Sequence, residues 1–255
     1  LAAEPYMTAT SIQKVATVFL VLGEYLRLMI LPVPLIFDYG FRHIRYVEFN
    51  DASAIISFVI YLILTMAGIW WTFKRRAPGF LLLAYVSGIV LLSNLFFNVG
   101  PMLAERFLFT PGFFLIAAVV YPFKYVLAAN RKRTGTVAVA AALMFSASWS
   151  FAKVRERCLE WKDNRKLYAA DLKKAPDSFR IQAFNGMEAV AAAMQEQDSI
   201  KRTEGFRDAI NYFRQSFMIY PDYKMLYRDW GMAYYMLNDL DSAEWAWGRH
   251  RELYP

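Results

Sequence analysis

The chain has 255 residues, of which 57% are hydrophobic and 17% aromatic, and it carries a formal net charge of +7. That apolar fraction excludes an ordinary soluble protein. One cysteine and two histidines exclude an internal disulfide and a metal site built from Cys and His.

Five apolar runs precede the charged part of the chain; they cover residues 12–36, 52–73, 79–97, 107–129 and 135–151. Each is long enough to cross a hydrocarbon core of ~30 Å. The first contains Glu24 and Arg27, so it could span the membrane or lie along the interface as an amphipathic or re-entrant helix. We therefore predict an all-α fold whose residues 1–152 form a polytopic membrane domain of about five helices.

The basic residues predict how these helices are oriented. Lys74–Arg76 and Arg131–Arg133 occupy short breaks between apolar runs, which is typical of cytoplasmic loops. The loops at 37–51 and 98–106 then face the other side, together with everything after residue 151. The clusters lie beside membrane helices without interleaved aromatic residues, so we expect membrane lipid and no nucleic acid as a partner.

Residues 153–255 are charged, aromatic and helical in periodicity, and they contain a repeat. The spacing is that of a tetratricopeptide repeat, a helical hairpin of about 34 residues, at Tyr227, Trp230, Gly231, Tyr234, Ala243, Trp247 and Pro255. Gly231 and Ala243 are expected to be small because two helices cross closely there. We predict an extracytoplasmic α-solenoid whose tyrosines either pack helices or line a groove for a polypeptide.

An acidic and a basic residue, Glu105 and Arg106, stand side by side between two apolar runs. Holding charges at that depth is costly, which indicates a function. The other interpretation is a structural pair that anchors the following helix at the membrane interface.

Four stretches together carry a family resemblance: Tyr25 with 31–39, 93–97 with Gly100, 104–109 with Pro111, and Trp161 with Tyr168 and Pro176. They resemble the transmembrane and tetratricopeptide-repeat-containing protein O-mannosyltransferases of the GT-C class. The sequences Asn94-Leu95-Phe96 and Ala104-Glu105-Arg106 are its most specific parts.

The resemblance implies an integral membrane glycosyltransferase of the endoplasmic reticulum or a bacterial inner membrane. Such enzymes transfer mannose from a polyprenyl or dolichyl phosphate to Ser or Thr hydroxyls of an extracytoplasmic polypeptide. It implies no covalently bound cofactor and indicates no divalent metal. It also places the catalytic carboxylate upstream of Leu1, so the catalytic residue is unknown within this chain, which we expect to be the C-terminal portion of the enzyme.

Several polar residues are candidates for the site. Arg106 is expected to bind the donor phosphate, because its planar fork matches phosphate oxygens, and Glu105 is expected to orient either Arg106 or an acceptor. Asp38, Tyr39 and Asn94 are candidates for positioning the sugar or acceptor, although Asp38 could be a turn residue and Asn94 a helix cap. Glu24 and Arg27 share a helical face, so they either pair with each other, which we favour, or line a lipid-phosphate groove.

Two other functions remain open at this stage. A membrane-anchored repeat scaffold without catalysis would suit residues 153–255 but leaves Glu105 and Arg106 without a role. An oligosaccharide polymerase or ligase with a terminal repeat domain would use a diphosphate-linked glycan instead of a mannosyl-phosphate lipid.

Overall fold

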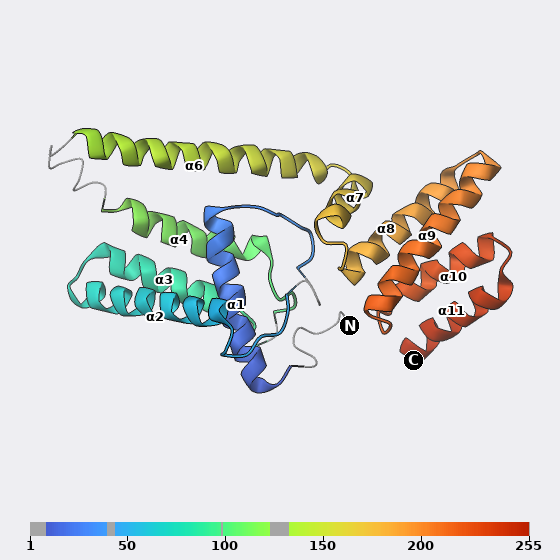
Figure 1. The fold of residues 1–255 in the computed structure, drawn as a ribbon, viewed down its shortest axis with the longest axis horizontal. Coiled ribbons are helices and arrows are strands. Elements are labelled where there is room, and N and C mark those ends of the chain that lie inside the picture. The colour runs from blue at the N-terminus through green and yellow to red at the C-terminus, as the bar shows by residue number, and fades with distance from the viewer. Residues whose placement is uncertain (1–8, 40–43, 98, 123–132, 255) are drawn as a thin grey trace. The chain divides into compact units, whose positions relative to one another are not determined.

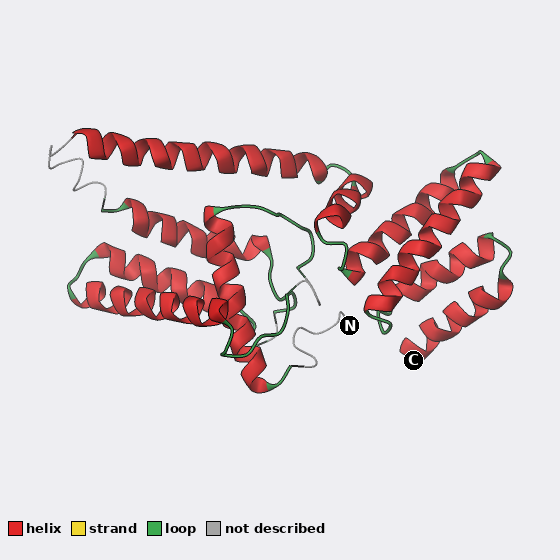
Figure 2. Ribbon diagram, viewed as in Figure 1, coloured by secondary structure: helices red, strands yellow, loops and turns green. Residues whose placement is uncertain are grey.

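The computed structural model describes residues 9–39, 44–97, 99–122 and 133–254. Regular structure in this part of the chain consists of helices alone, as Figure 2 shows. The residues group into two compact units. We call Pro5–Leu35 with Arg45–Arg157 the apolar unit, and Ile36–Ile44 with Cys158–Pro255 the hairpin unit.

The apolar unit begins with three helices, α1 (Ser11–Ile30), α2 (Ala52–Phe73) and α3 (Ala77–Leu91), seen in Figure 1. Thr10 and Gln13 form a reciprocal capping box at the start of α1. The Asp51 carboxylate caps α2 by accepting from the amides of Ser53 and Ala54. These caps fix where α1 and α2 begin, which the mostly apolar residues inside the helices do not determine.

Close contacts hold these three helices together. A Cβ on Gly23 of α1 would lie 2.0 Å from the Ser57 Oγ of α2, so the two helices approach closely at this glycine. The Tyr61 and Tyr85 hydroxyl oxygens, from α2 and α3, are 2.7 Å apart. Hydrogen bonds between apolar helices satisfy polar groups that lipid cannot.

Next come the 3₁₀-helix η1 (Glu105–Leu108), α4 (Phe109–Val120) and α6 (Arg133–Glu160). Their bounds differ from the apolar runs. The third run continues to residue 97, but α3 ends at Leu91. At the fourth run, helical structure begins at Glu105, just before the run, and continues to Val120. Residues 123–129 of that run lie outside the described residues. α6 continues past residue 151 because Lys153, Arg155 and Glu156 are as compatible with a helix as the apolar residues before them.

Among the described helices, α2 alone is long and apolar enough to cross a membrane, and α3 is apolar but shorter. Only 22% of the apolar stretch of α2 is buried, and large side chains such as Ile56, Ile63 and Met66 are exposed. An apolar helix that points its side chains outward is unlike a core helix of a soluble protein. The structure thus supports one span, and the count of about five is not confirmed.

The hairpin unit contains α7 (Asn164–Lys174), α8 (Phe179–Gln195), α9 (Ser199–Ile219), α10 (Leu226–Met236) and α11 (Leu240–Leu253). Helix α8 packs on α9 and α10 on α11, as two antiparallel hairpins in Figure 1. Side-chain oxygens of Asp163, Ser178, Asp198 and Asp239 cap the starts of α7, α8, α9 and α11.

Both hairpins cross at a glycine. A Cβ on Gly231 would lie 2.4 Å from Trp247 Nε1, and one on Gly186 would lie 2.5 Å from the Phe213 ring. Ala243 is 1% exposed. The close crossing that the sequence predicts at Gly231 is therefore present. Pro255 lies outside the described residues.

The remaining signature residues belong to the aromatic core of the hairpin unit. Tyr227 and Trp230 are buried, and their rings are stacked at 6.1 Å between centroids. Trp230 also stacks on Tyr234 at 5.9 Å and meets Trp245 edge-on at 5.3 Å. These rings bury a large apolar area between α9, α10 and α11.

Candidate functional site

Arg106 lies at the N-terminal start of the helical segment formed by η1 and α4. Its side chain is exposed, with the guanidinium carbon 5.3 Å from the centre of the Phe107 ring. Glu105 is half-buried beside it. An exposed guanidinium at the start of an apolar helix is suited to bind an anion.

The segment before Arg106 is tied down from two directions. Met102 and Leu103 are buried. The Ala104 amide donates to the Tyr25 hydroxyl of α1 at 3.1 Å, and the Ala104 carbonyl accepts from the Phe107 amide at 3.0 Å. Arg106 therefore projects from a fixed backbone.

Asn94 organises the loop between α3 and η1. Its Nδ2 donates to the Pro101 carbonyl at 2.8 Å, and its Oδ1 accepts from the Val99 amide at 2.7 Å. Its φ of +61° lies in the left-handed region, which asparagine tolerates better than most residues. The structure thus gives Asn94 a loop-stabilising role, while a contact with sugar stays a prediction.

Glu24 and Arg27 pair with each other on α1, as the favoured interpretation predicts. Arg27 Nε lies 2.6 Å from Glu24 Oε2, and Arg27 Nη1 donates to the Val33 carbonyl at 2.6 Å. Both side chains are a little over one-third exposed. The pair fixes the turn after α1, and a lipid-phosphate groove at these residues stays a prediction.

Asp38 is buried in the hairpin unit, with 7% of its surface exposed. Its Oδ1 accepts from Arg180 Nη1 at 2.8 Å, and its Oδ2 accepts from Ser178 Oγ at 3.3 Å. Tyr39 is also buried, and its hydroxyl accepts from the Ile36 amide at 3.3 Å. These contacts hold the segment 36–39 in place, which is a structural task that the sequence did not assign to Asp38.

Phe37 is the residue of this segment that sequence reasoning missed. Its ring lies 5.6 to 6.2 Å, between centroids, from the rings of Trp161, Tyr168 and Phe184. Its amide donates to the fully buried Asp171 carboxylate at 2.5 Å. No local pattern could reveal this site, because the partners are more than 100 residues away in the sequence.

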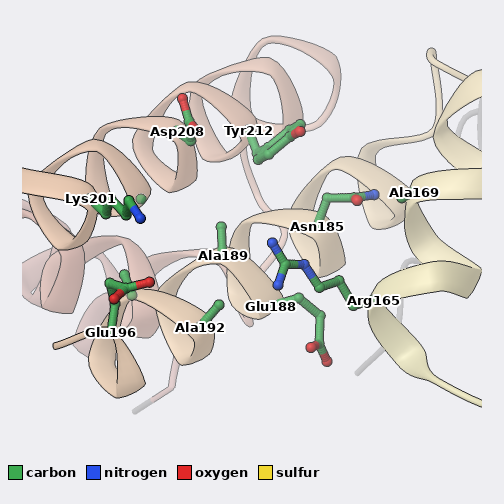
Figure 3. Close-up of a pocket in the computed structure, with 12 residues that line it drawn as sticks. Arg165, Ala169, Asn185, Glu188, Ala189, Ala192, Glu196, Lys201, Asp208 and Tyr212 are labelled. Carbon is green, nitrogen blue, oxygen red and sulfur yellow. The ribbon is translucent and has the colours of Figure 1, made fainter. Parts of the chain in front are cut away.

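A groove of about 420 Å³ runs between α7, α8 and α9 in the hairpin unit (Figure 3). Its floor is formed by small residues, Ala169, Ala189, Ala192 and Ala193. Charged and polar side chains surround the floor: Arg165, Asn185, Glu188, Glu196, Lys201, Asp208 and Tyr212. Within the described part of the chain, Arg165, Lys201, Glu188 and Asp208 form no ion pair with one another or with other residues.

Among the tyrosines of residues 153–254 that the structure describes, Tyr212 lines this groove. Tyr223 and Tyr227 are buried in the core, which matches the packing alternative. Burial raises the pKa of the Tyr223 hydroxyl to about 12, with the nearby Arg180 guanidinium opposing that rise. Tyr227 donates its hydroxyl hydrogen to the Pro221 carbonyl.

Two residues of the second basic cluster, Arg131 and Lys132, lie outside the described residues, as does Arg42 in the loop before α2. Arg45, another arginine of the loop before α2, pairs with Asp51 at 2.7 Å. In the described ranges, no three His, Cys, Asp or Glu side chains gather closely enough to hold a metal ion.

The comparisons with known proteins give one functional indication. No family model matches the chain, and no solved structure does. The chain is similar to a protein O-mannosyl-transferase of Caenorhabditis elegans, with 27% identity over 156 residues. That similarity covers 60% of this chain and 21% of the relative, so the chain spans about a fifth of that protein's length. The relation fits a glycosyltransferase-like protein.

Proposed function

We propose that this chain is part of an integral membrane glycosyltransferase that moves mannose from a polyprenyl or dolichyl phosphate to Ser or Thr hydroxyls of a protein. The observation that carries the proposal is the similarity to a protein O-mannosyl-transferase. The hairpin unit is a pair of tetratricopeptide-like repeats on the extracytoplasmic side. Its glycine crossings at Gly186 and Gly231 support that assignment.

In this proposal Arg106 binds the phosphate of the donor. Its exposed guanidinium at the start of an apolar helix would meet a lipid phosphate where bilayer and water meet, and it can give two parallel hydrogen bonds to phosphate oxygens. As the sugar–phosphate bond breaks, negative charge grows on the departing lipid phosphate. A fixed cation stabilises that charge more than it stabilises the bound donor, and this difference accelerates the reaction.

The reaction forms a bond between the acceptor oxygen and C1 of the sugar and breaks the bond from C1 to the phosphate oxygen. The acceptor proton passes to a carboxylate that the family resemblance places upstream of Leu1. Glu105 orients Arg106, and Asn94 fixes the loop that leads to it. Asp38 and Tyr39 act from the hairpin unit, where they hold the segment 36–39 for acceptor positioning.

The groove between α7, α8 and α9 is where we place the acceptor polypeptide. Its alanine floor leaves room for a backbone, and its unpaired charges of both signs could bind polar side chains of a passing segment. Tyr212 adds an aromatic contact at the rim.

The test uses the full-length protein that contains this chain, in proteoliposomes, with radiolabelled mannosyl-phosphate polyprenol and a Ser/Thr-containing acceptor protein. Arg106→Gln is expected to lower kcat/KM about 100-fold or more, and Arg106→Lys to recover part of the loss. Arg76→Gln is the matched control, since Arg76 is an exposed arginine in another turn between apolar helices.

Two results would contradict the proposal. One is unchanged transfer in Arg106→Gln. The other is a wild-type protein that transfers no sugar from a mannosyl-phosphate lipid but still captures partners through the hairpin unit, which is the behaviour of a scaffold. Transfer from a diphosphate-linked glycan alone would identify a polymerase or ligase instead.

A further inference from the structure

The hydroxyl of Tyr25 is the group that fixes the backbone leading into the proposed phosphate site. We infer that Tyr25 is a positioning residue for donor binding, acting on Arg106 through the Ala104 amide. This inference rests on the proposed function, since it concerns the same donor site.

Tyr25 is completely buried on α1, so its hydroxyl does not face bulk water. That hydroxyl accepts the hydrogen bond from the Ala104 amide at 3.1 Å, across 79 residues of sequence. Ala104 is the residue immediately before η1, and no side chain caps this helix. An uncapped helix start leaves its first amides without partners, so a hydrogen bond from outside contributes directly to where the helix begins.

The position of Arg106 depends on this anchor because the bond to Tyr25 holds Ala104, the residue from which the first turn starts. η1 has four residues, none of them buried. The chain enters it from the buried pair Met102 and Leu103, and Ala104 connects that buried segment to the turn in which Arg106 is exposed. A shift at Ala104 moves Arg106 with it, and a displacement of about 1 Å at a binding group is enough to lose much of its effect.

Two other buried tyrosines of the apolar unit, Tyr61 and Tyr85, differ from Tyr25 in their hydrogen-bond partners. Tyr61 donates to the Leu22 carbonyl at 3.1 Å, so the hydrogen in its 2.7 Å contact with Tyr85 comes from Tyr85. These bonds join α1, α2 and α3 and do not involve the loop that carries Arg106. Tyr85→Phe is therefore a matched control, because it deletes a buried hydroxyl from the same unit and leaves the Ala104 amide paired.

The experiment measures donor KM and kcat for Tyr25→Phe, Tyr85→Phe, Arg106→Gln and the Tyr25→Phe/Arg106→Gln double variant, in the full-length protein. Phenylalanine keeps the ring and removes only the acceptor, so the fold is expected to persist. Tyr25→Phe should raise the donor KM about three- to tenfold. Tyr85→Phe should leave it unchanged, and the double variant should be no worse than Arg106→Gln alone, because both changes act through one group.

Hydrogen exchange of peptides covering 102–109 supplies a readout that does not need activity. The Ala104 amide should exchange faster in Tyr25→Phe and at the wild-type rate in Tyr85→Phe. Unchanged exchange overturns the anchor, and faster exchange with unchanged donor KM overturns the positioning role. If wild-type protein transfers no sugar, the proposed function fails and the positioning role with it, while exchange still decides whether Tyr25 holds Ala104.

Discussion

The guanidinium of Arg180 donates to the carboxylate of Asp38 at 2.8 Å, joining two residues that are 142 positions apart. Their side chains are 18% and 7% exposed, so both charges are largely withdrawn from water. Such a pair is costly to form, but removing one partner is costlier still, because it leaves the other charge buried and alone.

Arg180→Gln is therefore expected to destabilise the hairpin unit by about 3 kcal/mol. Adding Asp38→Asn should recover part of that loss, since no charge is then left unpaired. Pulse proteolysis of the detergent-solubilised protein at increasing urea measures both effects. Arg228→Gln is the control: Arg228 pairs with Asp229 while 70% exposed, and its loss should cost less than about 1 kcal/mol. Equal effects of the two arginine variants would contradict a buried pair.

Phe37→Ala should cost the hairpin unit about 2 kcal/mol, because the ring contacts three aromatic side chains while 38% exposed. Phe49→Ala removes an equally exposed ring, at 42%, from the apolar unit. Cleavage near residue 37 by a protease of broad specificity should accelerate in Phe37→Ala only. Similar acceleration in both variants would mean that the Phe37 contacts do not hold the segment.

Gly231→Ala should destabilise the second hairpin by about 1–3 kcal/mol, because the added Cβ would meet the Trp247 ring, which is held by a 3.1 Å hydrogen bond to the Arg228 carbonyl. Gly248→Ala should stabilise α11 by about 0.5–1 kcal/mol, since nothing lies within 4 Å of its Cβ and alanine favours helix. Urea unfolding curves compare the two. A stabilised Gly231→Ala protein would refute the close crossing.

The raised pKa of Tyr223 predicts how the stability of the hairpin unit changes at alkaline pH. That pKa is about 12 in the folded protein, against 10.0 for a tyrosine exposed to water, so between these pH values the unfolded chain loses the proton first. The folded state then binds more protons, and stability falls as pH rises, by about 2–3 kcal/mol in total. Below pH 10 the contribution is complete.

Tyr223→Phe cannot ionise at this position, so its stability should fall less steeply between pH 10 and 12. Urea midpoints measured across that range test the difference. Parallel curves for the two proteins would show that Tyr223 does not titrate in the unfolded chain before it does in the folded one.

Local patterns in the sequence predicted local features of the structure. The three-residue spacing of Glu24 and Arg27 predicted their ion pair, and the spacing around Gly231 predicted a helix crossing that the structure contains. The first depends on two residues of one helix, where helical geometry decides which side chains meet. The second depends on the spacing within one helical hairpin.

Contacts between distant residues could not be predicted in this way. The rings around Phe37 and the partner of Asp38 come from helices more than 100 residues later, and no periodicity connects them to the loop. Apolar runs also failed to predict where helices end, because they continue beyond the helices they form, as after Leu91. The sequence identified Arg106 as a charge between apolar runs. The hydrogen bond from the Ala104 amide to Tyr25, which holds the backbone before it, could be seen only in the structure.

The hairpin unit is discontinuous, since the segment Ile36–Ile44 joins helices that begin after Cys158. During synthesis the ribosome makes Phe37 and Asp38 long before Asp171, Arg180 or Phe184. Until those later residues are made, the early segment has none of these contacts, so the hairpin unit completes its folding only after most of the chain has been synthesised.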